Sequence, residues 1–211
     1  MNRLFDYDNP IMGFISTACD LILLNLIFMV FCLPIITIGA SVTSLYYVTL
    51  KIVRNEAPAI WSNFWMSFRE NFKVSTLIWV VYLLFAGLLA FNYWASPILI
   101  PAFAVETRTA VIILALLFFC SGMYVFPILS RFVCTGKQAI KNALLMACAH
   151  FPKTLLLVLI HCLCPLICLI SNKLFLSVSS LFLVCGFSVV ALTASVVFNQ
   201  IFRRYEVSYD L

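Results

Sequence analysis

Long runs of apolar residues constrain this chain more than any other feature. Residues 72–95, 108–129, 154–171 and 174–199 form four such runs, and about 20 helical residues cross ~30 Å of hydrocarbon. Of the 211 residues, 64% are hydrophobic and 10% are charged, whereas soluble domains have roughly 45–50% and 25%. A soluble domain of this size buries only about 70% of its chain surface. We therefore predict an all-α, multi-pass transmembrane bundle that lies in the lipid bilayer.

The first fifty residues contain two further candidate spans. Residues 11–33 form one apolar run, which Pro34 ends because proline cannot donate the next helical hydrogen bond. Residues 34–53 form the second run, in which Gly39 and several hydroxyl residues would let neighbouring helices approach closely. The sequence thus predicts one membrane domain over residues 1–211 with six spans, or five if residues 34–53 do not cross.

The positive charges orient the predicted spans. The 13 Lys and Arg fall in short separate clusters, which is typical of membrane-protein loops and argues against nucleic-acid binding. With six spans, eleven of them lie on one side, and only Arg108 and Lys173 lie on the other. With five spans the division is ten to three. Both arrangements place the loops 51–73 and 131–153 and the C-terminus in the cytoplasm.

Each of these two basic loops is expected to contain an amphipathic helix lying in the headgroup layer. The first has an aromatic stripe at helical spacing beside a polar face, formed by Trp61, Phe64, Trp65, Phe68 and Phe72. The second, weaker stripe is formed by Ile140, Ala143, Leu144, Ala147 and Phe151. The alternative is that both segments are connectors packed in the core. Residues 47–77 and 127–157 also share six identities at an offset of 80 residues, a weak internal repeat of the kind found in some transporters.

Three polar residues within the apolar runs are candidates for an intramembrane site. Asp20 and Asn25 lie in the first run, and ionisable residues in a span are costly enough to suggest function. The alternative is that Asp20 lies near a helix end or stabilises helix packing. His161 is the one candidate partner for Asp20 in the middle of a span.

Metal binding and catalysis have little support in the sequence. His161, Cys164 and Cys168 share one helical face and could bind a soft metal, but a defined fourth ligand is lacking. Buried cysteines are also common in apolar surroundings. The chain has no phosphate-binding glycine loop, nucleophile elbow, zinc-protease motif or paired carboxylates. We therefore expect a protein that is not an enzyme and has no metal or other cofactor.

Several segments carry a resemblance to a known family. They are NPIMGFISTACDLILLNLIFMVFCLPIITIGAS (9–41), LYYVTLKIVRNE (45–56), FWMSFRENFKVSTLIW (64–79), VFPILSRF (125–132) and KNALLMACAHFPKTLLL (141–157). Together they resemble the YesL family of bacterial integral membrane proteins. Val133 and Cys134 depart from the polar or acidic residues that this family tends to have there. The resemblance implies a bacterial cytoplasmic-membrane protein associated with carbohydrate uptake, and it implies no catalytic residue.

Three functions follow from these observations. The first is a non-enzymatic accessory or regulatory subunit whose partners are the subunits of a carbohydrate importer of the ATP-binding-cassette (ABC) type. The second is an autonomous transporter of a small solute or ion, with a polar path near Asp20 and Asn25. The third is an importer permease subunit, for which Glu56-Ala57 only faintly resembles the segment that couples permeases to their ATPase.

Overall fold

The computed structural model describes residues 10–99, 101–170 and 182–206, in which all regular structure is helical. The elements are α1 (Pro10–Cys32), η1 (Ile35–Thr37), α2 (Ile38–Val53), α3 (Ile60–Leu99), η2 (Pro101–Phe103), α4 (Ala104–Arg131), α5 (Gly136–Ala149), α6 (Phe151–Ile170), η3 (Phe182–Gly186) and α8 (Phe187–Glu206). The expectation of an all-α fold is confirmed for these residues. Among the described residues, five helices are long and apolar enough to cross a membrane, or six if the bent pair α5–α6 forms one span. The choice of six spans stays a prediction.

Pro34 separates α1 from α2, as the sequence predicts. Hydroxyl groups after the break supply hydrogen bonds to carbonyls at the end of α1. Thr37 Oγ1 donates to the Phe31 and Pro34 carbonyls at 2.6 and 2.8 Å, and Ser41 Oγ donates to the Phe31 carbonyl at 3.0 Å. These bonds fix the short turn between the two helices.

Helix α2 is the centre of the bundle and packs against α1, α3, α4 and α8. A Cβ added to Gly39 would lie 2.5 Å from the Ser75 carbonyl oxygen, so α2 and α3 approach as closely as their backbones allow. Buried hydroxyl pairs join α2 to its neighbours, Thr43 to Ser75 at 2.9 Å and Thr49 to Ser195 at 2.8 Å. The expectation that small and hydroxyl residues pack closely here is confirmed.

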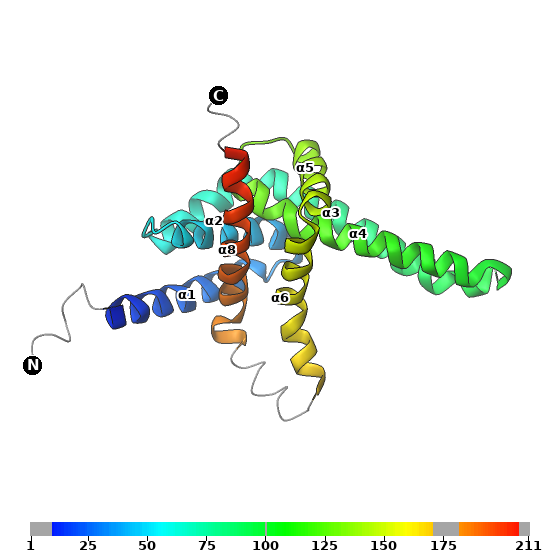
Figure 1. Cartoon of the computed structure of the whole chain (residues 1–211), viewed down its shortest axis with the longest axis horizontal. Coiled ribbons are helices and arrows are strands. Elements are labelled where there is room, and N and C mark those ends of the chain that lie inside the picture. Colours follow the sequence, from blue (N-terminus) through cyan, green and yellow to red (C-terminus); the bar gives the residue numbers. More distant parts are fainter. Residues whose placement is uncertain (1–9, 100, 171–181, 207–211) are drawn as a thin grey trace, which may run out of the picture.

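Helices α3 and α4 form a long antiparallel hairpin that extends away from α6 and α8 (Figure 1). The 40 residues of α3 correspond to about 60 Å of helix. The segment Trp61–Phe72, expected to be a separate surface helix, is instead the first part of α3. That expectation was wrong in this respect, because no proline or glycine interrupts the helix between Phe72 and the apolar run that follows. Whether this segment lies in the headgroup layer stays a prediction.

The second basic loop does contain a helix of its own, α5. It begins at a capping box formed by Thr135 and Gln138 and meets α6 at a bend of 103°. Ala143 and Ala147 are buried as the predicted stripe requires, but Ile140 is only half-buried, and Leu144 and Phe151 are exposed. The two copies of the weak repeat therefore differ in shape, since the first copy runs straight through α3 where the second bends.

Candidate functional site

Asn25 is fully buried and joins α1 to the start of α8. Its side-chain Nδ2 donates to the Leu183 carbonyl at 2.8 Å, and its Oδ1 accepts from the Ser188 backbone N–H at 3.1 Å. Leu183 belongs to η3, a single turn of π-helix, and such turns leave backbone groups without their usual α-helical partners. Ser188 Oγ adds a bond to the Leu21 carbonyl at 2.7 Å. The amide of Asn25 is thus used to hold the η3–α8 junction against α1.

Asp20 lies one turn and a half before Asn25 on α1 and is half-buried. The five-residue spacing rotates it by about 140° around the helix, so the two side chains point to different faces. Among the described residues, Asp20 has no hydrogen bond or ion pair. The structure therefore does not bring Asp20, Asn25 and His161 together into one polar site.

His161, on α6, faces α2. Its Nδ1 lies 2.8 Å from the Leu157 carbonyl, which can only accept, so Nδ1 carries the proton and donates. Its Nε2 is then the acceptor of the Tyr46 hydroxyl at 3.1 Å. Tyr46 itself is buried. The pair links α2 and α6 with a neutral imidazole.

The Tyr46–His161 pair lines a cavity of about 1000 Å³, which we call the aromatic groove. Its long walls come from α3 and α4, and it also includes residues of α2 and α6. The residues of α3 are Trp79, Tyr82, Leu83, Ala86, Leu89, Ala90 and Tyr93, and those of α4 are Val111, Ile112, Ala115, Phe118, Phe119, Gly122, Met123 and Phe126. Two of the polar side chains on these walls form hydrogen bonds within the protein. The Tyr82 hydroxyl bonds to Ser121, and Trp79 Nε1 donates to the Ile35 carbonyl at 2.8 Å. The groove therefore offers an almost entirely apolar surface.

Sequence reasoning did not predict this groove, although part of its signal is present in the sequence. Small residues recur at helical spacing among aromatic ones, as Ala86 and Ala90 on α3 and Ala115 and Gly122 on α4. That spacing indicates a face where space can open between helices. Which helices face each other depends on residues far apart in the sequence, and helical spacing within one helix does not predict it.

The predicted aromatic stripe at the start of α3 divides into two faces. Phe64 and Phe68 are buried and pack against Phe31 of α1, with ring centroids 5.4 and 4.9 Å apart. Trp61 and Trp65 also contact the Phe31 ring, with centroids 6.3 and 5.8 Å away, but they are exposed to 58% and 40%. Phe72 is exposed to 38% and contacts only the Phe68 ring among the described aromatic side chains. The stripe thus anchors α3 to α1 and leaves an aromatic surface outside.

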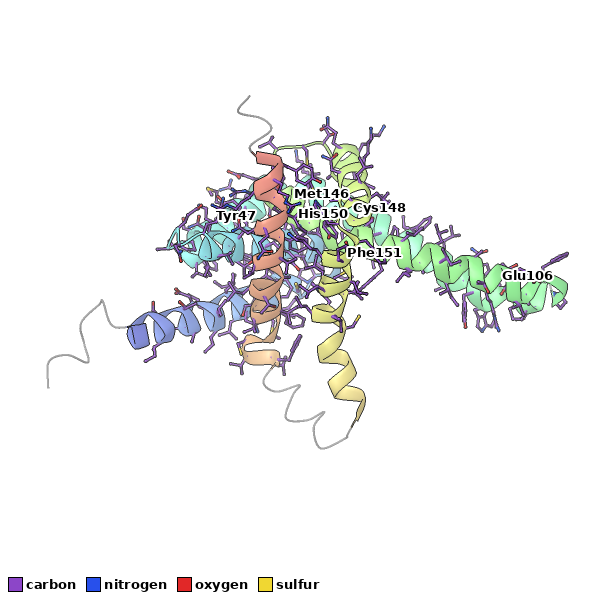
Figure 2. All side chains as sticks on the ribbon, in the orientation of Figure 1. Tyr47, Glu106, Met146, Cys148, His150 and Phe151 are labelled. Atoms are coloured by element: carbon purple, nitrogen blue, oxygen red, sulfur yellow. The ribbon has the colours of Figure 1, made fainter. Side chains whose placement is uncertain are left out.

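The bend between α5 and α6 holds a second histidine. His150 Nε2 lies 3.1 Å from the Tyr205 hydroxyl of α8, and Figure 2 shows His150 beside that helix. Partial burial, together with the nearby charges of Lys153 and Arg204, lowers the pKa of His150 below its ordinary value. This group connects the α5–α6 bend to the C-terminal helix.

Within the described residues, no group of three or more His, Cys, Asp or Glu side chains could hold a metal ion. The side chains of Cys164 and Cys168 lie outside the described part of the structure. The proposed set with His161 therefore stays a prediction.

The long apolar helices, joined by buried hydroxyl and amide contacts, are those of a polytopic helical membrane protein. Residues 21–93, which cover the second half of α1, all of α2 and most of α3, match the family described as "Protein of unknown function, DUF624". No curated protein and no solved structure matches the chain.

Proposed function

We propose that this protein is a non-enzymatic accessory subunit of an ABC-type carbohydrate importer in a bacterial cytoplasmic membrane. The match of residues 21–93 to DUF624, a domain that YesL-type proteins carry, supports the proposal. Association with carbohydrate uptake comes from the resemblance to the YesL family. Neither the domain match nor the family resemblance depends on a catalytic residue.

The observation that carries the proposal is an exposed aromatic and cationic surface at the start of α3, formed by Trp61, Trp65 and Arg69. The two indole rings stack with centroids 6.5 Å apart and planes 3° apart, and the Arg69 guanidinium lies 6.0 Å from the Trp65 ring. Tryptophan and arginine are the residue types that most often dominate the binding energy of protein interfaces. The buried Phe64 and Phe68 hold this surface rigidly, which lowers the entropic cost of binding.

The contacts of Asn25 favour an accessory subunit over an autonomous transporter. Both ends of its amide are bonded to backbone groups of η3 and α8, so it is not free to bind a passing solute. The permease alternative gains no support from Glu56 and Ala57, which lie in the turn between α2 and α3. Ala57 has a positive φ of 41° there.

The test is purification of the full chain at native expression in a mild detergent, followed by mass spectrometry of the proteins that accompany it. We expect importer subunits to co-purify with the natural protein. They should be lost from the double variant Trp61→Ala/Trp65→Ala. Trp94→Ala is the matched control, because Trp94 is a still more exposed tryptophan, at 67%, near the opposite end of the same helix. Absence of importer subunits from the natural protein would contradict the proposal, and so would their retention by a double variant that reaches normal membrane levels.

A further inference from the structure

We propose that the aromatic groove, together with Arg108 at its mouth, binds one anionic phospholipid, with the acyl chains in the groove and the phosphate at the guanidinium. This inference does not depend on the proposed role in carbohydrate uptake. It follows from the size of the groove, its chemistry and the position of one charge.

The length of the groove suits acyl chains. It extends along α3 from Trp79 to Tyr93, a distance of about 21 Å at 1.5 Å per residue. The hydrocarbon core of a bilayer is about 30 Å thick, so the acyl chains of one leaflet span about 15 Å. The groove is therefore long enough to hold the acyl chains of one lipid along α3.

One end of the groove is lined by α2. Gly39 of α2 lies against Trp79 and Phe126, and Val42 and Tyr46, one and two turns further along α2, line the groove at that end. The nearby hydroxyl of Tyr46 and Nε2 of His161 bond to each other. With those polar groups occupied, this end suits the methyl ends of acyl chains.

The other end carries a cation. Arg108 continues the groove-lining stripe of α4, because it lies three and four residues before Val111 and Ile112 on the same helical face. Its guanidinium lies 5.0 Å from the Tyr93 ring, and its Nε donates to the Tyr93 carbonyl at 3.4 Å. These two contacts fix the side chain beside the groove.

The rest of the Arg108 guanidinium is available to a ligand. No carboxylate of the described residues pairs with it, including Glu106, which lies two residues earlier near the tip of the hairpin (Figure 2). A planar guanidinium with free N–H groups binds phosphate oxygens in a bidentate manner. A cation at the mouth of a long apolar groove matches the two parts of an anionic phospholipid.

The experiment measures lipid binding by native mass spectrometry of the full chain in detergent, titrated with phosphatidylglycerol or phosphatidylcholine of identical acyl chains. We expect one tightly bound phosphatidylglycerol and a preference for it over phosphatidylcholine. Arg108→Gln should reduce that preference by about five-fold, the effect of one basic residue near an anionic headgroup, because phosphatidylcholine, whose choline cation offsets its phosphate charge, loses less affinity than phosphatidylglycerol. Lys137→Gln removes an exposed charge on α5 and should change nothing.

Two groove variants test the acyl-chain site independently of the charge. Ala115→Trp and Ala90→Trp fill the groove from opposite walls and should abolish tight binding of both lipids. Leu116→Trp is the control, because Leu116 is exposed outside the groove. Circular dichroism of each variant identifies any that fail to fold. Unchanged lipid binding by a folded Ala115→Trp or Ala90→Trp variant would overturn the proposal. So would an unchanged headgroup preference in Arg108→Gln, or displacement of the phospholipid by an equal concentration of oleate.

Discussion

The buried amide of Asn25 offers a sharp test of how this fold is held together. Asn25→Leu keeps a side chain of similar size but removes the bonds to the Leu183 carbonyl and the Ser188 N–H. Those backbone groups lie at a π-turn and at the first turn of α8, and the side chains of Asn25 and Ser188 are fully buried. The substitution should therefore weaken the contact between α1 and the C-terminal helix.

The magnitude follows from the two bonds. Hydrogen bonds between membrane helices contribute about 0.6 kcal/mol on average and at most about 1.7 kcal/mol each. Loss of both predicts destabilisation by about 1–3 kcal/mol. Larger values hold for buried groups in water-soluble proteins, but an unfolded chain in a micelle also finds partners for its polar groups. Leu26→Ala is the control, because Leu26 is next in sequence and half-exposed, and it should cost less than about 0.5 kcal/mol.

The assay is unfolding of the purified protein by sodium dodecyl sulfate in mixed micelles, followed by circular dichroism. Hydrogen exchange of the Ser188 amide gives a local measurement, and its protection should fall in Asn25→Leu and not in Leu26→Ala. If Asn25→Leu unfolds within about 0.5 kcal/mol of the natural protein and Ser188 keeps its protection, the amide is not the tie between α1 and α8.

Three further predictions follow from other contacts. Gly39→Ala should destabilise the bundle by about 1–3 kcal/mol, because the added Cβ would lie 2.5 Å from the Ser75 carbonyl oxygen. Gly87→Ala is the control in the same detergent unfolding assay, and it should be neutral or stabilising because the space around Gly87 is open. Stability should decline as pH falls from about 7 to about 5. The folded protein lowers the pKa of His150, so His150 takes up a proton more readily in the unfolded chain. His150→Gln should flatten that part of the pH profile of stability. Asp20→Asn should accumulate normally, since Asp20 pairs with no described group, and unchanged sugar-dependent growth of that variant would remove the transporter alternative.

The local parts of the fold could be predicted from the sequence. The break at Pro34 follows from a missing donor, and the close packing of α2 follows from Gly39 and its neighbouring hydroxyls. These are properties of residues a few positions apart, which helical spacing reports directly. The apolar runs likewise predict helices because no other structure satisfies the backbone in lipid, apart from closed barrels.

The long-range parts could not be predicted. Asn25 resembled a candidate for a solute path because an amide in an apolar run is unusual, but its partners lie 158 and 163 residues away. The aromatic groove depends in the same way on the pairing of α3 with α4 and the approach of α6. The error at Trp61–Phe72 has another origin. The prediction assigns the stripe to a separate helix, although no proline or glycine divides it from the apolar run that continues α3.

The length of α3 connects the two proposals. Trp65 and Tyr93 are 28 residues apart in one helix, which corresponds to about 42 Å and matches the ~40–45 Å thickness of a bilayer with its headgroups. An upright α3 would therefore place the Trp61–Trp65–Arg69 surface and the Arg108 mouth at opposite faces of the membrane. This agrees with the charge distribution, which predicts Arg69 on the cytoplasmic side and Arg108 outside. Sites so far apart share no contacts, so variants at one should not alter binding at the other. Protein binding and lipid binding can thus be tested separately on one continuous helix.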